Sequence, residues 1–193
     1  MLRRLYDWTM GLAAKRHALW ALGAVAFVES SIFPIPPDLL LIPMVLAQRR
    51  RAWVIAGVTT ASSVAGGLAG YAIGALFFEG FGRDLLAFYG HLDKFTSFQS
   101  YYNEWGAWIV AMAGVTPFPF KVITIASGVT RLDLGVFIAA SVAARGFRFF
   151  LVAGLLWYFG EPLRNFIERY LPWLVALFFV LLLGGFLIVR FVI

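Results

Sequence analysis

Hydrophobic runs of unequal length alternate with short polar stretches along this chain. Three of the runs are long enough, at about 1.5 Å per helical residue, to cross a hydrocarbon core of roughly 30 Å, and they cover 53–78, 134–159 and 171–189. Two others, 17–33 and 39–47, are shorter, and the second would extend only about 14 Å as a helix. The pattern predicts an all-α polytopic membrane protein in which some helices span the bilayer and others do not.

The two shorter runs flank the stretch Glu29–Asp38, which reads ESSIFPIPPD. Pro34, Pro36 and Pro37 remove backbone donors and prevent one continuous helix. Because irregular backbone at membrane depth is tolerated only inside protein or beside water, we predict a re-entrant helical hairpin over about 17–47, with these prolines at its tip. Basic residues stand on both sides of it, which predicts that both of its ends and the N-terminus are cytoplasmic: Arg3, Arg4, Lys15 and Arg16 before it, and Arg49, Arg50 and Arg51 after it.

Residues 105–130 repeat this arrangement. An apolar stretch leads to Pro117 and Pro119, and Lys121 then precedes a second short apolar stretch. Since neither stretch spans a bilayer by itself, we predict a second re-entrant hairpin that enters from the outside. The alternative is a single kinked crossing of 26 residues, which would invert the orientation of everything downstream.

The remaining segments are expected to border these hairpins and spans. Residues 79–104 are more polar and carry a helical stripe of apolar side chains, so we predict an amphipathic helix on the outer membrane face or over the mouth of a pore. Residues 1–16 predict an interfacial amphipathic helix, with a frayed polar tail as the alternative. Residues 161–193 predict a linker followed by a C-terminal transmembrane helix.

Small side chains recur every four residues along the span 53–78. Ser62 is followed by Gly66, Gly70 and Gly74 on the same face of the predicted helix. Such a strip lets the backbones of two membrane helices approach closely. Helix packing is therefore the role that we expect of these glycines.

Composition narrows the class of protein further. The chain has 193 residues, of which 62% are hydrophobic and 13% charged, and its mean hydropathy of +0.85 is typical of an integral membrane protein. It has no cysteine, and its two histidines, His17 and His91, lie near segment ends, so we expect no disulfide, metal or other cofactor and no enzymatic relay. The net charge of +6 lies mostly beside hydrophobic runs, where it meets anionic lipid head groups rather than nucleic acid.

Five charged residues lie in hydrophobic surroundings and are candidate site residues: Glu29, Asp38, Lys121, Arg145 and Arg148. An ionisable side chain at bilayer depth costs about 2.5 kcal/mol or more, unless a partner or water offsets this cost. Glu29 and Asp38 would line a wet cavity as a protonatable pair; the alternatives are a structural ion pair and, for Asp38, a cap of the following helix. The three cations would bind a lipid phosphate, or one arginine would only neutralise an acid. With three cations against two acids, one positive charge would remain for an anionic substrate.

These residues resemble the DedA family, also called the VTT or SNARE-associated Golgi protein domain family, over about 20–160. The resemblance rests on three motifs: Glu29 with Pro34-x-Pro36-Pro37-Asp38, the glycine-rich run 66–74, and the second proline hairpin, which ends in Ser127-Gly128. The small size and the sequence TPFPFK at 116–121 are most similar to the YqaA-like branch. The resemblance implies movement of lipids across bilayers, by scrambling or flipping phospholipids or polyprenyl-phosphate carriers, and dependence of some members on the proton gradient. The acidic pair carries over by position, but the family usually has arginines around the second hairpin's proline, where this chain has only Lys121.

Broken hairpins in corresponding halves of a chain, entering from opposite faces, predict an inverted-repeat transporter with a site near the bilayer midplane. We therefore expect transport of a lipid or a small anionic solute across a bacterial inner membrane, with anionic lipids and protons as partners and a homo-oligomer as one open arrangement. A membrane scaffold or envelope-assembly factor is the competing class. It has no need for charges at the midplane, so tolerance of their neutral substitution would distinguish it.

Overall fold

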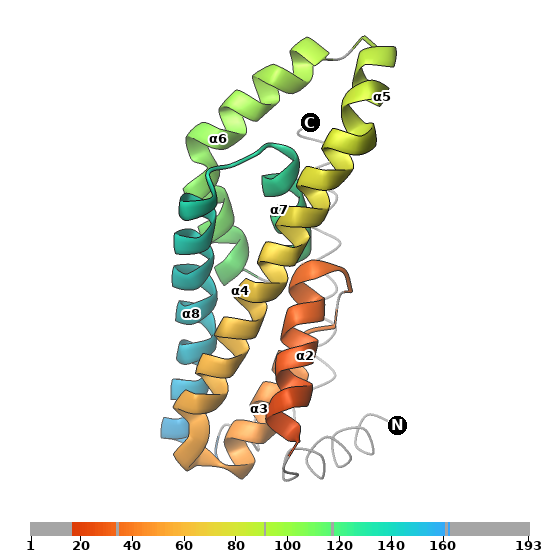
Figure 1. Cartoon of the computed structure of the whole chain (residues 1–193). Coiled ribbons are helices and arrows are strands. Elements are labelled where there is room, and N and C mark those ends of the chain that lie inside the picture. Colours follow the sequence, from red (N-terminus) through yellow and green to blue (C-terminus); the bar gives the residue numbers. More distant parts are fainter. Residues whose placement is uncertain (1–16, 34, 91, 117, 161, 163–193) are drawn as a thin grey trace.

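The computed structural model describes residues 17–162 apart from 34, 91, 117 and 161. Every regular element in this part of the chain is a helix, so the all-α prediction is confirmed. In chain order the elements (Figure 1) are α2 (Ala18–Ser31), α3 (Asp38–Ala47), η1 (Arg49–Arg51), α4 (Ala52–Phe77), η2 (Phe78–Gly82), α5 (Arg83–Phe88), α6 (Leu92–Val115), α7 (Phe120–Val129) and α8 (Leu134–Phe159).

Helices α2 and α3 fold back on each other as a short helical hairpin (Figure 1). Ala18 and Leu22, at the start of α2, share one buried cluster with Met44 and Val45, at the end of α3. The chain reverses in the proline-containing connection, and α3 begins directly after Pro37. Proline suits the start of a helix because its fixed φ is helical and its missing N–H would be unpaired there in any case.

Helices α6 and α7 form a second helical hairpin, whose connection faces that of the first (Figure 1). The hydroxyl of Tyr102 on α6 lies 3.1 Å from that of Ser127 on α7, and Nε2 of Gln99 donates a 2.8 Å hydrogen bond to the carbonyl of Thr130. Along a straight helix, residues 25 positions apart would be separated by roughly 37 Å. These contacts exclude a single kinked helix over 105–130.

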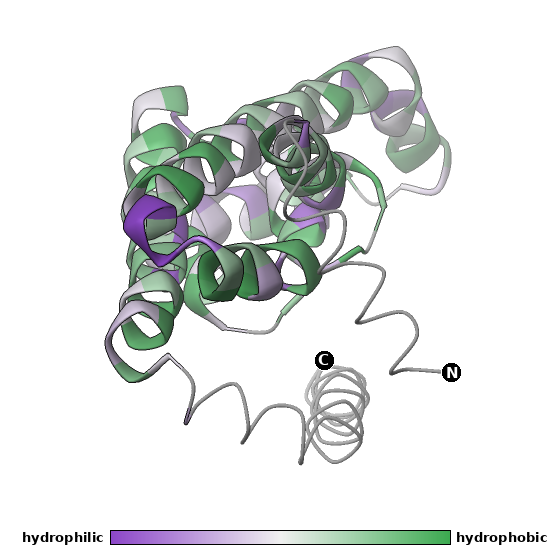
Figure 2. Ribbon diagram, turned by 90° about the horizontal axis from the view of Figure 1, so that it is seen from below, coloured by the Kyte–Doolittle hydropathy of each residue, from purple (hydrophilic) through white to green (hydrophobic). Residues whose placement is uncertain are grey.

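Helices α4 and α8 are the long apolar helices of the described chain, and they coincide with the predicted spans 53–78 and 134–159. The continuous helical stretch Arg49–Phe88 has 40 residues and Leu134–Phe159 has 26, and both are long and apolar enough to cross a membrane. Figure 2 shows that hydrophobic residues dominate the helical ribbons. Large apolar side chains also face outward, as Trp20 does with 81% of its surface exposed, which favours a surface in contact with lipid.

The outer segment 79–104, predicted as one helix, is instead divided between two helical stretches. Its first part continues α4 through η2 and α5, and its second part is the first half of α6. The break falls near Gly90, whose φ of 67° is a conformation that glycine adopts without strain. No proline or positive-φ glycine lies between Leu92 and Val115, so α6 runs through position 105 without interruption.

Two further predictions fall partly or wholly outside the described residues. These are the amphipathic helix over 1–16 and the linker and C-terminal membrane helix over 161–193, which contains the predicted span 171–189. The described residues test neither of these terminal segments.

Glycines on α4 let two other helices approach its backbone closely. A Cβ atom at Gly66 would collide with the backbone of Phe27 on α2, and one at Gly74 would collide with the backbone of Ile125 on α7. Gly70 lies between these two contacts and faces a threonine side chain of α7. Because α4 also packs along α8, it is the central helix against which the hairpins are placed.

Candidate functional site

A buried arginine lies where α2, α4 and α8 meet. Arg145, on α8, is 1% exposed, and its Nη2 donates a 2.6 Å hydrogen bond to Oε2 of Glu29 on α2. Its guanidinium lies between two rings, with Cζ 4.8 Å from the centroid of Phe120 and 4.7 Å from that of Phe149. A buried guanidinium without a partner would be strongly destabilising, and the carboxylate and the ring faces offset this cost. Glu29 and Arg145, both predicted as site residues, are thus in direct contact.

Two serine hydroxyls complete the surroundings of this ion pair. Nε of Arg145 donates to Oγ of Ser63 on α4 at 2.6 Å. Oγ of Ser63 lies 2.7 Å from Oγ of Ser30, and Ser30 in turn donates to Oε2 of Glu29 at 3.1 Å. The four side chains form a closed ring of hydrogen bonds, which we call the Glu29–Arg145 ring, and it joins α2, α4 and α8.

Arg148 lies on the same face of α8, three residues after Arg145, and it connects the two helical hairpins. Its Nη2 donates a 2.6 Å hydrogen bond to Oδ2 of Asp38 at the start of α3. Its Nη1 donates a 3.1 Å hydrogen bond to the main-chain carbonyl of Thr116, just after α6. The planar guanidinium fork reaches both acceptors at once, which the single ammonium of a lysine does not reproduce.

The alternative role of Asp38 as a helix cap is wrong. The cap position of α3 is Pro37, and no side-chain cap hydrogen bond forms there. Asp38 is instead the first residue of the helix, where its negative charge is stabilised by the helix dipole as well as by Arg148. Its second oxygen, Oδ1, is buried and has no hydrogen-bond partner within the described part of the chain.

Lys121 is placed differently from the two arginines. Its Nζ donates a 3.0 Å hydrogen bond to the carbonyl of Ile32, just after α2, and Oγ1 of Thr124 donates a 3.0 Å bond to the carbonyl of Ser30. The last carbonyls of a helix have no partner within the helix, and a lysine at that end also complements the helix dipole. Helix α7 therefore caps the end of α2. Among the residues that the structure describes, Lys121 takes part in no ion pair, so the positive charge left over by the two pairs resides on it.

The predicted tip prolines lie in the two connections. Pro36 and Pro37 precede α3, Pro119 is the N-cap residue of α7, and Pro34 and Pro117 lie outside the described residues. Because proline has no N–H, the chain turns at these positions without leaving that donor unpaired in apolar surroundings.

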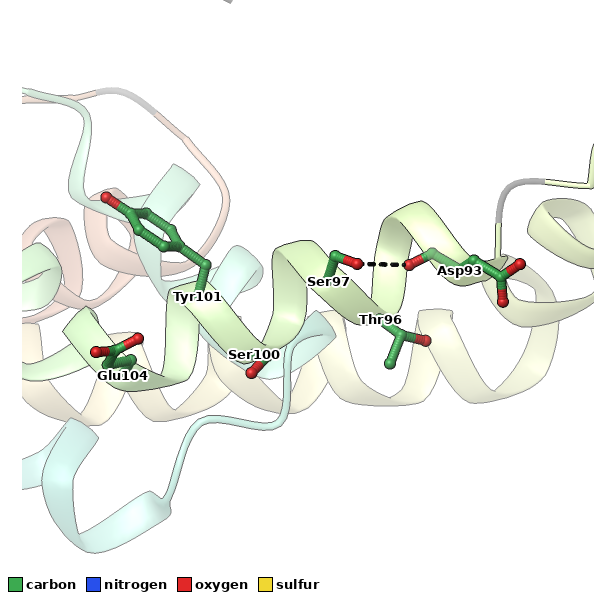
Figure 3. A pocket seen from close by; sticks show the side chains of 6 residues that line it. All are labelled: Asp93, Thr96, Ser97, Ser100, Tyr101 and Glu104. Atoms are coloured by element: carbon green, nitrogen blue, oxygen red, sulfur yellow. Dashed lines mark hydrogen bonds between the residues drawn. The ribbon is translucent and has the colours of Figure 1, made fainter.

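A shallow surface hollow of about 680 Å³ lies elsewhere, along α6 (Figure 3), and is lined by Asp93, Thr96, Ser97, Ser100, Tyr101 and Glu104. Asp93 and Glu104 lie at opposite ends of it, and Oγ of Ser97 donates a 3.0 Å hydrogen bond to the main-chain carbonyl of Asp93. No group of three or more His, Cys, Asp or Glu residues that could hold a metal ion occurs among the described residues. The hollow shares no residue with the ion pairs, and we assign it no function.

Four residues around the ion pairs are not distinguished by the sequence pattern: Ser30, Ser63, Phe120 and Phe149. Ser63 stands in a stretch of small residues typical of helix packing, and the chain has 20 phenylalanines, so neither type is conspicuous. The one signal in the sequence is that Ser30 directly follows Glu29, since a hydroxyl beside a buried carboxylate is a suitable donor.

Comparison with known proteins assigns the chain to a family. The family model of the VTT domain matches residues 35–158, a range that contains four of the five charged site residues and begins just after Glu29. An uncharacterized protein of Haemophilus influenzae is 36% identical over 168 residues, which cover 85% of this chain and 87% of that protein. A Histophilus somni protein, described as an uncharacterized homologue of HI0703, is 34% identical over 177 residues, which cover 90% of this chain and 92% of that protein. No solved structure gives a significant match. The resemblance inferred from the motifs is confirmed, and the chain belongs to the VTT-domain, or DedA, family of membrane proteins.

Proposed function

We propose that this protein is a membrane transporter that moves a lipid, by scrambling or flipping a phospholipid or a polyprenyl phosphate, across the bacterial cytoplasmic membrane. Membership of the VTT-domain family supports a role in membrane transport. The two relatives come from bacteria, which supports the membrane that we assign. In this proposal the N-terminus is cytoplasmic, in agreement with the basic residues that flank the first hairpin.

The observation that carries the proposal is the two ion pairs, Glu29–Arg145 and Asp38–Arg148, which lie between helical hairpins of opposite direction. Ionisable residues within membrane segments are costly and typically mark pathways of substrates or ions. Packing alone does not require them, because apolar residues of similar volume often replace a buried ion pair with no loss of stability. We therefore assign the ion pairs to transport.

Helix lengths support re-entry of the first hairpin and of α7, the second arm of the second hairpin, whereas α6, its first arm, has 24 residues. Helices α2, α3 and α7 have 14, 10 and 10 residues, which corresponds to about 21, 15 and 15 Å against a hydrocarbon core of roughly 30 Å. None of the three spans the core by itself, so the tip of the first hairpin and the start of α7 would lie near the midplane. A hairpin followed by a span, repeated once in the opposite direction, is the arrangement of inverted-repeat transporters with a midplane site.

Lys121 is the residue that we assign to the anionic group of the lipid. Its ammonium binds the neutral carbonyl of Ile32, whereas both arginines are already paired with carboxylates. Exposed apolar side chains occur on both tips, including Phe33 at 61% and Val122 at 47% exposure, and this setting suits an amphiphile with a charged head group. Glu29 and Asp38 are the titratable acids of the site, so protons are the coupling ion to test first.

A membrane scaffold or assembly factor is the second candidate, because each acid has its own arginine, as in a structural ion pair. A transporter of a small anionic solute is the third. It would need the cation at Lys121 but not the exposed apolar side chains around it. The charge arrangement is common to all three candidates, so transport measurements must separate them.

Reconstitution of the purified chain into liposomes tests the proposal. Fluorescent anionic and zwitterionic phospholipids are placed in both leaflets, and an impermeant reductant then reports exchange between the leaflets, with and without a pH gradient. We expect faster exchange with the wild-type protein than in empty liposomes. Lys121→Met should slow exchange of the anionic lipid more than that of the zwitterionic lipid, and Lys121→Arg, which keeps the charge, should restore it.

Exchange no faster than in protein-free liposomes, for the anionic and the zwitterionic phospholipid and both with and without the pH gradient, would reject phospholipid transport. In that case uptake of an anionic solute into the same liposomes distinguishes the solute transporter from the scaffold. Equal effects of Lys121→Met on both lipids would reject the assignment of Lys121 to the anionic group while leaving lipid transport in place.

A further inference from the structure

Ser30 and Ser63 are completely buried, with exposed fractions of 0%, and no function assigned above depends on them. A buried hydroxyl on a helix commonly donates to a carbonyl of its own helix, as Thr59 does to Ile55 at 2.7 Å. The two serines make different hydrogen bonds. They bond to each other at 2.7 Å and to the two members of an ion pair.

The direction of each hydrogen bond in the Glu29–Arg145 ring follows from the chemistry of its members. A guanidinium only donates and an ionised carboxylate only accepts, whereas a serine hydroxyl has one proton to donate. Ser30 uses its proton toward Glu29, so the proton between the two hydroxyls must belong to Ser63. Ser63 can give up that proton because it accepts from Nε of Arg145. All bonds therefore run from Arg145 to Glu29, either directly or through both serines.

The path through the serines has two physical consequences. Its three hydrogen bonds, from Arg145 to Ser63, from Ser63 to Ser30 and from Ser30 to Glu29, run in the same direction and therefore polarise and strengthen one another. The ring also orients the guanidinium, because Nε donates to Ser63 on α4 and Nη2 donates to Glu29 on α2, while Cζ lies 4.8 and 4.7 Å from the ring centroids of Phe120 and Phe149. Both serines are completely buried, so their effect acts through Arg145 and Glu29.

We infer that Ser30 and Ser63 are positioning residues that hold the carboxyl group of Glu29 and the guanidinium of Arg145 in place for the transport step. The inference rests on the proposed function where it is tested by lipid exchange, but not where it is tested by chemical modification of Glu29. It also predicts unequal roles for the two hydroxyls. Loss of the Ser63 hydroxyl leaves the buried Nε–H of Arg145 without an acceptor, whereas loss of the Ser30 hydroxyl removes one donor from Glu29 and leaves both bonds of Arg145 in place.

Ser62 provides a matched control one position along the chain. It lies against Gly23 on the side of α4 that packs on α2, lines an apolar surface groove there, and belongs to neither ion pair. We expect Ser63→Ala to slow lipid exchange by about tenfold or more, and Ser30→Ala to slow it by a smaller factor. Ser63→Thr, which keeps the hydroxyl, should recover most of the rate, and Ser62→Ala should match the wild type.

The second measurement does not depend on transport. A membrane-soluble carbodiimide modifies protonated carboxyl groups, and mass spectrometry of the full-length protein in detergent locates the modification, with Glu29→Gln as the blank. We expect Glu29 to be modified several-fold faster in Ser30→Ala and Ser63→Ala than in the wild type or Ser62→Ala, because Ser30→Ala removes a hydrogen bond to its carboxyl group and Ser63→Ala removes the support of that bond.

Three outcomes overturn the inference. In the first, Ser63→Ala behaves as Ser62→Ala does in both measurements. In the second, Ser63→Ala loses transport while the modification rate of Glu29 stays at the wild-type value, which indicates general damage rather than loss of position. If Ser63→Ala does not fold, the rates at which carbodiimide modifies Glu29 in Ser30→Ala and in Ser63→Thr are compared instead. Equal rates in these two variants are the third outcome. Absence of lipid exchange in the wild type rejects only the proposed function, and the carbodiimide rates then decide the inference by themselves.

Discussion

Arg148 holds Asp38 through a 2.6 Å hydrogen bond, although the two residues are 110 positions apart in the chain. The same guanidinium binds the carbonyl of Thr116 in the opposite hairpin. Any movement that separates the two hairpin tips must therefore break at least one of these bonds. Separation of the two hairpin tips is therefore tested most directly at the contact between Arg148 and Asp38.

Arg148→Lys should lower the stability of the protein in detergent by about 1–3 kcal/mol and slow transport, because an ammonium does not serve both acceptors with the geometry of a guanidinium fork. Thermal unfolding followed by circular dichroism measures the first effect. Arg131→Lys is the matched control, since Arg131 pairs with Glu79 on the exposed surface, with 51% and 55% of the side chains accessible. An exposed pair contributes roughly 0–1 kcal/mol. Equal losses in both variants would contradict the bridging role of Arg148.

Glu29→Gln should abolish lipid exchange, because it removes the charge that compensates Arg145. The double variant Glu29→Gln/Arg145→Met removes both charges and should recover folding stability relative to Glu29→Gln, since no unpaired charge remains buried. Exchange should stay absent in the double variant if the site transports. Exchange at the wild-type rate in a well-folded double variant would instead reject the assignment of this ion pair to transport. Glu79→Gln, on the surface, is the control for the loss of one acid.

Gly74→Ala should destabilise the protein by about 1–3 kcal/mol, because its Cβ would meet the backbone of Ile125, which cannot move as a side chain does. A Cβ atom at Gly57, on the same helix, would meet nothing within 4 Å. Gly57→Ala should therefore be neutral or stabilising by about 0.5–1 kcal/mol through helix propensity. Melting temperatures of the two variants in one detergent compare them. A larger loss at Gly57 than at Gly74 would show that close packing of α4 on α7 is unimportant.

The chain contains no cysteine, so single cysteines report topology against a clean background. With re-entrant hairpins, His17→Cys and Arg50→Cys should react with an impermeant maleimide from the same side of oriented vesicles. Tyr89→Cys, after the long helical stretch Arg49–Phe88, should react from the other side. If α2 and α3 together crossed the bilayer, His17→Cys and Arg50→Cys would react from opposite sides, and the re-entrant arrangement would be rejected.

Much of the helical layout follows from local properties of the sequence. Apolar length predicts the positions of α4 and α8, and prolines that lack an N–H predict where the first hairpin turns. The outer segment shows where this reasoning fails. A stripe of apolar side chains continues from residue 81 to 95, but the backbone breaks near Gly90, and a periodic pattern does not record which glycine adopts a positive φ.

The sequence by itself determined which residues of this protein carry charge inside apolar surroundings, and hence that Glu29 and Arg145 needed partners. Only the tertiary structure decided which partners they have, because Glu29 and Arg145 are 116 positions apart and Lys121 and Ile32 are 89 positions apart. Ser30 and Ser63 show the same division: both hydroxyls are visible in the sequence, yet the 2.7 Å contact between them exists only because α2 packs against the glycine-lined face of α4. Side-chain partners across such distances depend on how helices pack, and no local periodicity encodes that packing.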